Sequence, residues 1–144
     1  MQTFLPYPSF FKSAQCLDYR RLGKQRVEAW QILQTLRRKS SGWKYHPAVK
    51  MWKGHEIILA TYGAVMCQEW IRRGYVDTLL PRFMAFINRS LGHTKDYGDK
   101  KRPAWIGSRK FHSSHKSNLM RKDKVYYGKH FGNFRNDLPY VWPV

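Results

Sequence analysis

The sequence predicts an all-α fold, and three observations lead to that prediction. Apolar residues recur at helical spacing over most of the chain, strand-like alternation is scarce, and Gly, Pro and Ser residues separate the helical segments. With 144 residues the chain is long enough to bury a substantial core. We therefore expect a single domain spanning residues 1–144, built as a compact helical bundle with a basic loop and an irregular aromatic tail.

The N-terminal part of the chain predicts a short helix followed by a long one. Residues 6–17 fit an extended lead-in and then a short helix, for which Ser9 is a suitable N-cap. A longer helix is expected from Asp18 to Arg38, with Gly23 as the point where it kinks or divides. The apolar stripe of this helix consists of Leu22, Ala29, Trp30, Leu33 and Leu36.

Two further helices are expected in the middle of the chain, after a loop at residues 40–43. The first begins at Pro47, because Pro is favoured in a first turn, and ends at Gly74, because Gly is favoured just after a last turn. The second is amphipathic and covers residues 81–92. The side chains of this region that we assign to the core are Trp52, Ile58, Leu59, Tyr62, Val65, Met66 and Trp70.

The last third of the chain predicts one helix between two irregular segments. Residues 93–110 are polar, basic and interrupted by Gly and Pro, so we expect a loop whose basic part, 95–103, is mobile. A helix is expected at 111–122, followed by an irregular tail of aromatic and basic residues. Rings among cations suit base stacking, but the hydrophobic end at 138–144 is expected to pack against the bundle.

The strongest compositional signal is the net charge of +18, from 27 Lys and Arg residues against 9 Asp and Glu. So many positive side chains repel one another in a compact fold, which favours a polyanionic partner. Nucleic acid is the first expectation and an anionic membrane the second. No run of 18 apolar residues, secretory signal or amphipathic anchor helix is evident. The two cysteines, Cys16 and Cys67, are expected to be buried free thiols, so we expect a protein of the cytoplasm and nucleoid.

The segment LDYRRLGKQRVEAW, residues 17–30, concentrates charge inside a helical pattern. On a helix, Arg20, Arg21, Lys24 and Glu28 share one polar face, on which Lys24 and Glu28 form an i,i+4 pair. Cations on such a face suit the binding of DNA phosphates, and a merely solvated basic surface is the alternative.

Arg26 departs from that face, because it falls on the apolar side between Leu22 and Trp30. A buried guanidinium costs several kcal/mol unless a carboxylate or a phosphate pairs with it. Two interpretations follow: a buried ion pair with one of the nine acids, or a cleft in which Arg26 contacts DNA phosphate.

Two histidines, His112 and His115, share one face of a predicted helix. We expect them to face DNA phosphates together with Lys116, Arg121 and Lys122, the alternative being that these side chains only cap or solvate a basic surface.

A metal site is another role open to the histidines, since His46 and the pair His55 and Glu56 lie upstream. No carboxylate completes a familiar metal signature, so we expect neither a metal nor any other cofactor. A metal-dependent nuclease is therefore the third choice of function.

Five segments of the chain resemble a known family. They are MQTFLPYPSF (1–10), LDYRRLGKQRVEA (17–29), HPAVKMWKGHE (46–56), FHSSHKSNLMRKD (111–123) and DLPYVWPV (137–144). Over nearly its whole length the chain is similar to the bacterial branch of the small all-α proteins related to pyrimidine-dimer DNA glycosylase of the endonuclease V type. The resemblance implies cleavage of the glycosidic bond of a damaged or modified pyrimidine in double-stranded DNA, and cutting of the abasic strand by β-elimination.

This chemistry needs an unprotonated amine as nucleophile and a carboxylate that stabilises the cationic sugar and shuttles protons. An α-amine, with an ordinary pKa of about 7.7–8.0, suits the task better than a lysine at about 10.4. We therefore expect the amine of Met1 to be the nucleophile, with Lys24 as the alternative. The carboxylate is expected to be Glu28 or Asp18.

The sequence departs from the phage enzyme of that family at two positions. There the nucleophile resembles a small N-terminal residue exposed by removal of Met, whereas the bulk of Gln2 normally blocks that removal. There the catalytic Glu follows the Arg of a Tyr-Arg-Glu run, whereas this chain reads Tyr19, Arg20, Arg21. A non-catalytic protein that binds DNA or RNA is therefore the alternative to an enzyme, and in either case we expect a monomer.

Overall fold

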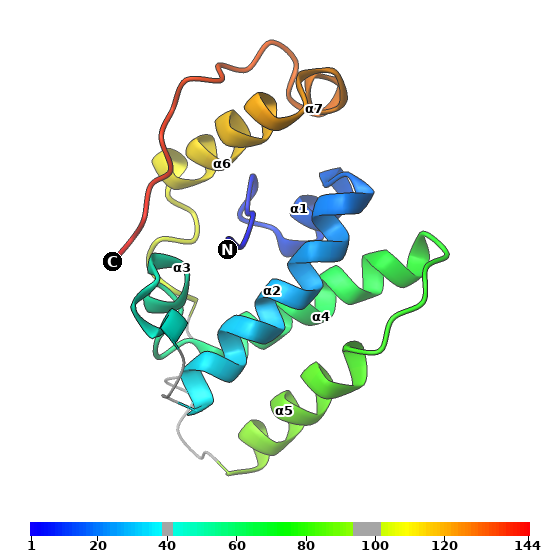
Figure 1. Cartoon of the computed structure of the whole chain (residues 1–144), viewed down its shortest axis with the longest axis vertical. Coiled ribbons are helices and arrows are strands. Elements are labelled where there is room, and N and C mark those ends of the chain that lie inside the picture. The colour runs from blue at the N-terminus through cyan, green and yellow to red at the C-terminus, as the bar shows by residue number, and fades with distance from the viewer. Residues whose placement is uncertain (39–41, 94–101) are drawn as a thin grey trace.

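The computed structural model describes residues 1–38, 42–93 and 102–144. Across these residues it contains seven α-helices, one short 3₁₀ helix and no strand, which confirms the predicted all-α class (Figure 1). The helices are α1 (Phe10–Cys16), α2 (Tyr19–Arg38), η1 (Gly42–Tyr45), α3 (Pro47–Lys50), α4 (Glu56–Arg72), α5 (Leu80–His93), α6 (Arg109–Lys122) and α7 (Lys124–Phe131).

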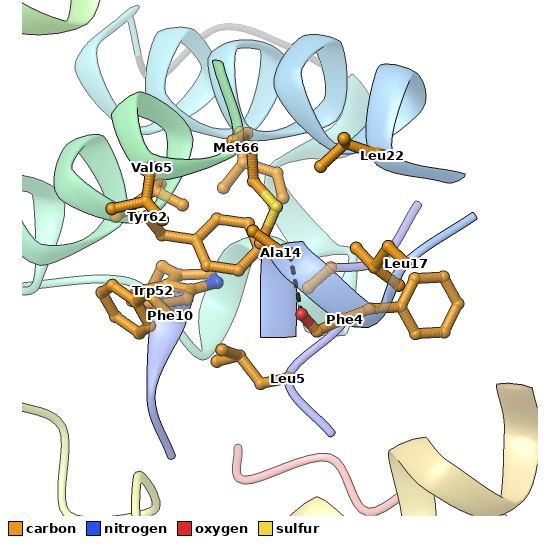
Figure 2. Close-up of a cluster of buried hydrophobic side chains, with 14 of the residues drawn as sticks. Phe4, Leu5, Phe10, Ala14, Leu17, Leu22, Trp52, Tyr62, Val65 and Met66 are labelled. Carbon is orange, nitrogen blue, oxygen red and sulfur yellow. Dashed lines mark hydrogen bonds between the residues drawn. The ribbon is translucent and has the colours of Figure 1, made fainter. Parts of the chain in front are cut away.

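The core is centred on the contact between α2 and α4, against which α1 and α5 also pack through α4. Figure 2 shows Leu22 of α2 together with Tyr62 and Met66 of α4 and with Trp52, and all four side chains are fully buried. Burial of an apolar side chain of this size contributes about 1.5–3 kcal/mol, so the cluster is a main source of the stability of the fold. The predicted core position of Trp52 is confirmed.

α2 is one continuous helix, so the prediction that Gly23 divides it is wrong. Gly23 instead leaves room for the ring of Trp70 from α4, because a Cβ at this position would lie 3.0 Å from two carbons of that ring. The missing side chain therefore serves the close approach of two helices and not a break in one.

The single helix predicted from Pro47 to Gly74 is divided in the structure into α3 and α4. Gly54 lies in the turn between them with a φ of +84°, a conformation that favours glycine and interrupts a helix. Gly74 follows the C-cap of α4 with a φ of +95°, which confirms the predicted end. The helices predicted at 81–92 and 111–122 are confirmed as α5 and α6.

The C-terminal tail contains a helix, α7, that the sequence analysis did not predict. The carboxylate of Asp123 caps its first turn by accepting a hydrogen bond from the backbone N–H of Tyr126 over 3.0 Å. Beyond α7 the chain is irregular and packs against the core, as predicted, through Tyr140, Val141 and Trp142.

The two predicted loops are described only in part. Residues 39–41 and 94–101 lie outside the described residues, and with them most of the basic segment 95–103. Of the loop predicted at 40–43, the described part belongs to the 3₁₀ helix η1.

Both cysteines are buried free thiols, as predicted. Burial raises the pKa of Cys16 to about 12, so this thiol stays protonated at neutral pH. No helix in the described ranges is long and apolar enough to cross a membrane.

Candidate functional site

A cavity of about 690 Å³ lies beside the N-terminal half of α2. Its walls come from parts of the chain that are far apart in sequence: the N-terminal segment, α2, the junction of α6 and α7, and the C-terminal segment (Figure 1). The cavity brings together all four residues predicted to be catalytic and three of those predicted to bind DNA. They are Met1, Asp18, Arg20, Arg21, Lys24, Glu28 and Lys122.

The N-terminal segment reaches this cavity through the core, and residues 2–5 are buried. Two side chains of α2 hold its backbone. The N–H of Gln2 donates a hydrogen bond to Oε2 of Glu28 over 3.1 Å, and the N–H of Phe4 donates to Oε1 of Gln25 over 2.7 Å. These bonds replace the hydrogen bonds to water that buried N–H groups lose on folding. They therefore hold the N-terminal segment in position beside α2.

Two core side chains hold the same segment from other directions. Nε1 of Trp52 donates to the hydroxyl of Thr3 over 3.0 Å. The hydroxyl of Tyr62 donates to the carbonyl of Phe4 over 2.9 Å (Figure 2). Polar groups placed inside the apolar core thus fix the path of the N-terminus.

His112 and His115 of α6 bind the segment from a further side. The N–H of Leu5 donates to Nδ1 of His115 over 2.9 Å, and the carbonyl of Leu5 accepts from Nδ1 of His112 over 2.7 Å. Nε2 of His112 accepts from the N–H of Gly107 over 2.8 Å, which leaves its proton on Nδ1.

Burial lowers the pKa of both imidazoles, that of His115 to about 3, so both rings are neutral near pH 7. Neither ring faces solvent, since His112 and His115 are buried. The expectation that they face DNA phosphates is therefore wrong, because the N-terminal segment takes up their hydrogen bonds.

The carboxylate of Glu28 binds the N–H of the chain's first peptide bond. Its Oε2 accepts from the N–H of Gln2 and, over 3.2 Å, from Nε2 of Gln25. Its Oε1 lies 4.0 Å from Nζ of Lys24, which confirms the predicted i,i+4 pair. The pKa of His46 is lowered by burial and then by the positive amino terminus, whereas the negative charge of Glu28 raises it. The amino terminus and Glu28 both act on this ring.

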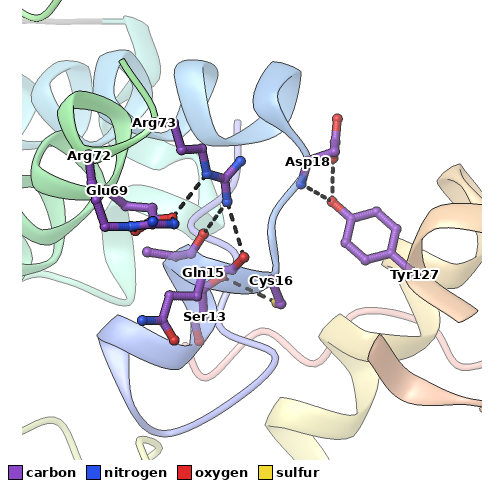
Figure 3. Close-up of polar contacts among 9 residues, drawn as sticks. Ser13, Gln15, Cys16, Asp18, Glu69, Arg72, Arg73 and Tyr127 are labelled. Carbon is purple, nitrogen blue, oxygen red and sulfur yellow. Dashed lines mark hydrogen bonds and ion pairs between the residues drawn. The ribbon is translucent and has the colours of Figure 1, made fainter. Parts of the chain in front are cut away.

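The carboxylate of Asp18 is held at the start of α2 by Tyr127 of α7 (Figure 3). Its Oδ1 accepts hydrogen bonds from the hydroxyl of Tyr127 and, over 3.1 Å, from Nη1 of Arg21. Burial raises the pKa of this carboxyl, but the bonds from Tyr127 and Arg21 outweigh burial and leave the pKa below its ordinary value. Asp18 is therefore an ionised group in a fixed orientation.

Three exposed cations, Arg20, Lys24 and Lys122, lie around the cavity. The side chain of Lys24 is 76% exposed despite its approach to Glu28. Nε of Arg20 donates to the hydroxyl of Tyr19 over 3.1 Å. Exposed cations on both sides of a cavity can contact the phosphates of a strand whose nucleotide enters it.

Two other predicted DNA-binding residues, Lys116 and Arg121, do not line the cavity. Nζ of Lys116 lies 4.7 Å from the ring centroid of Tyr7, a cation–π contact. The guanidinium of Arg121 donates to the side chain of Asn118 and to two backbone carbonyls of the C-terminal segment. Arg121 therefore ties that segment to α6.

Arg26 forms an ion pair with Asp77, and the two side chains are only 13% and 0% exposed. Asp77 also accepts hydrogen bonds from the N–H groups of Leu79 and Leu80 at the start of α5. The interpretation of Arg26 as a buried ion pair is confirmed, and the expectation that it contacts DNA phosphate is wrong, because Asp77 occupies its guanidinium.

The histidines form no metal centre in the part of the chain that the structure describes. No group of three or more His, Cys, Asp or Glu side chains there is arranged to hold a metal ion. His46 caps α3 instead, since its Nδ1 accepts from the N–H of Ala48 over 3.0 Å.

Two residues that build the site were not predicted from the sequence. Gln25, only 2% exposed, supports both Phe4 and the carboxylate of Glu28. Tyr127, fully buried, orients Asp18. For Gln25 a signal was present, because an amide on the apolar stripe of α2 needs a buried partner.

Of the comparisons with known proteins, the one with protein families found a match. A family model described as pyrimidine dimer DNA glycosylase matches residues 1–80, which hold the N-terminal segment, α2 and the Met1, Asp18, Lys24 and Glu28 positions. Neither the curated proteins nor the solved structures provide a match. The family match covers more than half of the 144 residues, and the chain belongs to the pyrimidine dimer DNA glycosylase family.

Proposed function

We propose that this protein is a DNA glycosylase with abasic-site lyase activity, which excises a damaged or modified pyrimidine from double-stranded DNA. One observation carries the proposal: the N–H of Gln2 binds the carboxylate of Glu28 beside a cavity lined by cations. The chain's amino terminus and a carboxylate are thereby held together where DNA can reach them.

The nucleophile in this proposal is the α-amine of Met1. An α-amine is deprotonated more readily near neutral pH than a lysine side chain, because its ordinary pKa is lower. Met1 lines the cavity and its neighbour Gln2 is pinned to Glu28. Lys24 is the alternative nucleophile, but its side chain is largely exposed, so its position is less well defined.

The proposed reaction begins when the amine nitrogen bonds to C1′ of the sugar as the glycosidic C1′–N bond breaks. The electron pair leaves with the base, which takes up a proton from water. Glu28 accepts a proton from the attacking nitrogen and returns it to O4′ as the C1′–O4′ bond opens, which leaves a Schiff base. The Glu28 carboxylate, deprotonated again, then takes a proton from C2′, and the C3′–O bond breaks as its electron pair leaves with the phosphate.

Asp18 takes the second carboxylate role in this proposal. It is ionised and oriented by Tyr127 and Arg21, so it adds negative potential where the cationic sugar develops. Arg20, Arg21, Lys24 and Lys122 would hold the flanking phosphates. A cavity of 690 Å³ is within the range of about 300–1,000 Å³ typical of ligand sites, and suits one extruded nucleotide.

Borohydride trapping tests the proposal. The protein is mixed with ultraviolet-irradiated duplex and, separately, with abasic-site duplex, and borohydride is added to reduce any Schiff base. A covalent protein–DNA band is expected with both, and peptide mapping should find the adduct on Met1. An adduct on Lys24 would identify Lys24 as the nucleophile in place of Met1. Tight, salt-sensitive binding without any covalent band would favour a protein that binds DNA without catalysis.

A further inference from the structure

Three aromatic rings form a stack beside the cavity. The rings of Trp70 and Tyr75 are stacked with centroids 4.2 Å apart and an angle of 27° between their planes. Tyr19 stacks in turn on Tyr75, at 6.5 Å and 29°. The stack thus joins the end of α4 to the first residue of α2.

The inner end of the stack is rigidly held. The guanidinium of Arg26 lies 4.5 Å from the ring centroid of Trp70 while it binds the buried Asp77. Nε1 of Trp70 donates to the carbonyl of Val76 over 2.9 Å, and Gly23 allows the ring to lie directly against α2. An aromatic surface supported in this way loses little conformational freedom when a ligand binds it.

The outer end of the stack reaches solvent. Tyr19 is 51% exposed and Tyr75 is 42% exposed, so neither ring is needed to fill the core. Tyr19 also lines the cavity, next to Arg20, whose Nε binds the tyrosine hydroxyl. A ring that is preformed, half-exposed and flanked by a cation has the chemistry that binds an unpaired nucleobase and its phosphate.

We infer that Tyr19, backed by Tyr75, forms a stacking surface for a nucleobase that loses its pairing or stacking partner in DNA bound at the cavity. The inference rests on the proposed binding of DNA at this site, but not on any step of the glycosylase chemistry. When one nucleotide enters the cavity, the base opposite it loses its pairing partner and the base flanking it loses a stacking partner. Either can supply the ring that stacks on Tyr19.

A cycle between protein and DNA variants tests the inference and distinguishes the two sources. The duplexes carry tetrahydrofuran, an abasic analogue that forms no Schiff base, at the target position. In two further duplexes the opposite base or the flanking base is also replaced by tetrahydrofuran. Affinities are measured for the wild-type protein and for Tyr19→Leu, Tyr75→Leu and Tyr19→Phe.

Tyr19→Leu and Tyr75→Leu are each expected to weaken binding about tenfold on the first duplex, whereas Tyr19→Phe keeps the ring and the affinity. The loss should vanish on the duplex that lacks the stacked base, which identifies that base as opposite or flanking. No loss, or the same loss on all duplexes, would overturn the stacking surface alone. If the effect of the tyrosine variants depends on the stacked base but no borohydride adduct forms, the glycosylase chemistry would be overturned and the stacking surface kept. A protein that binds none of the duplexes would overturn both proposals.

Discussion

The backbone N–H of Gln2 lies 3.1 Å from Oε2 of Glu28, a residue 26 positions further along the chain. The same oxygen accepts a second bond, over 3.2 Å, from Nε2 of Gln25. Glu28 therefore combines two properties: it is a carboxylate at the cavity, and it supports the peptide that follows Met1. The two properties can be separated by substitution, because an amide oxygen accepts the Gln2 bond but carries no charge.

Glu28→Gln should abolish turnover and spare DNA binding. The amide keeps an acceptor for Gln2, whereas loss of the carboxylate removes a proton shuttle worth about 10²–10⁴-fold in rate. Single-turnover base release would fall at least about 100-fold, and affinity would stay within about twofold of wild type. Glu56→Gln, at the start of α4 and away from the cavity, is the matched control. Unchanged base release in Glu28→Gln would remove Glu28 from the reaction.

Blocking the amino terminus should prevent adduct formation. Two residues added before Met1 remove the free α-amine from this position at the cavity while leaving the cations of the cavity in place. We expect no borohydride adduct from this variant, with DNA binding retained. Lys24→Arg keeps the positive charge without a primary amine and should still form the adduct. The reverse pair of results would assign the nucleophile to Lys24.

The buried histidines should make stability depend on pH above the range in which carboxylates titrate. The pKa of His115 falls from an ordinary 6.5 to about 3 in the folded protein, so between these values the unfolded chain binds the additional proton. The free energy of unfolding therefore decreases as the pH is lowered from about 6.5, by up to about 1.4 kcal/mol per pH unit for each such histidine. His112 is shifted in the same direction.

Urea unfolding at about pH 7 and pH 5 measures this dependence, since both lie above the ordinary carboxyl pKa values of about 3.9–4.3. His115→Asn should be less stable at pH 7 but should lose less stability between the two pH values. His130→Gln, at an exposed position of α7, should keep the wild-type dependence. Equal losses in wild type and His115→Asn would contradict the assignment of a neutral, buried imidazole.

Substitution of Arg26 should lower stability without affecting DNA binding, whereas substitution of Arg20 should weaken DNA binding without affecting stability. Arg26→Met leaves the buried carboxylate of Asp77 without its partner and should cost about 3–5 kcal/mol in urea unfolding. Arg20→Ala, at an exposed position, should change stability by no more than about 0.5 kcal/mol. It should instead reduce the slope of log affinity against log salt by about 1, while Arg26→Met leaves that slope unchanged. A reduced salt slope for Arg26→Met would instead show that Arg26 contacts DNA phosphate.

Most helices and the basic face of α2 could be predicted from the sequence, because both depend on residues three and four positions apart. The stripe of α2, the Lys24–Glu28 pair and the end of α4 at Gly74 are local features of this kind. The local signal failed at Gly23, since only the packing of Trp70 against α2 shows why the side chain is absent.

By itself, therefore, the sequence determined the all-α class, most helices and the set of charged residues from which a site could be built. Only the tertiary structure decided which of them meet. His115 binds Leu5 across 110 positions and Arg26 binds Asp77 across 51, and no periodic pattern connects residues so far apart. Burial then decided their roles: a polar group inside the core must find a partner there, so His115 and Arg26 support the fold. Glu28 and Asp18 instead line the cavity, where we propose their catalytic roles.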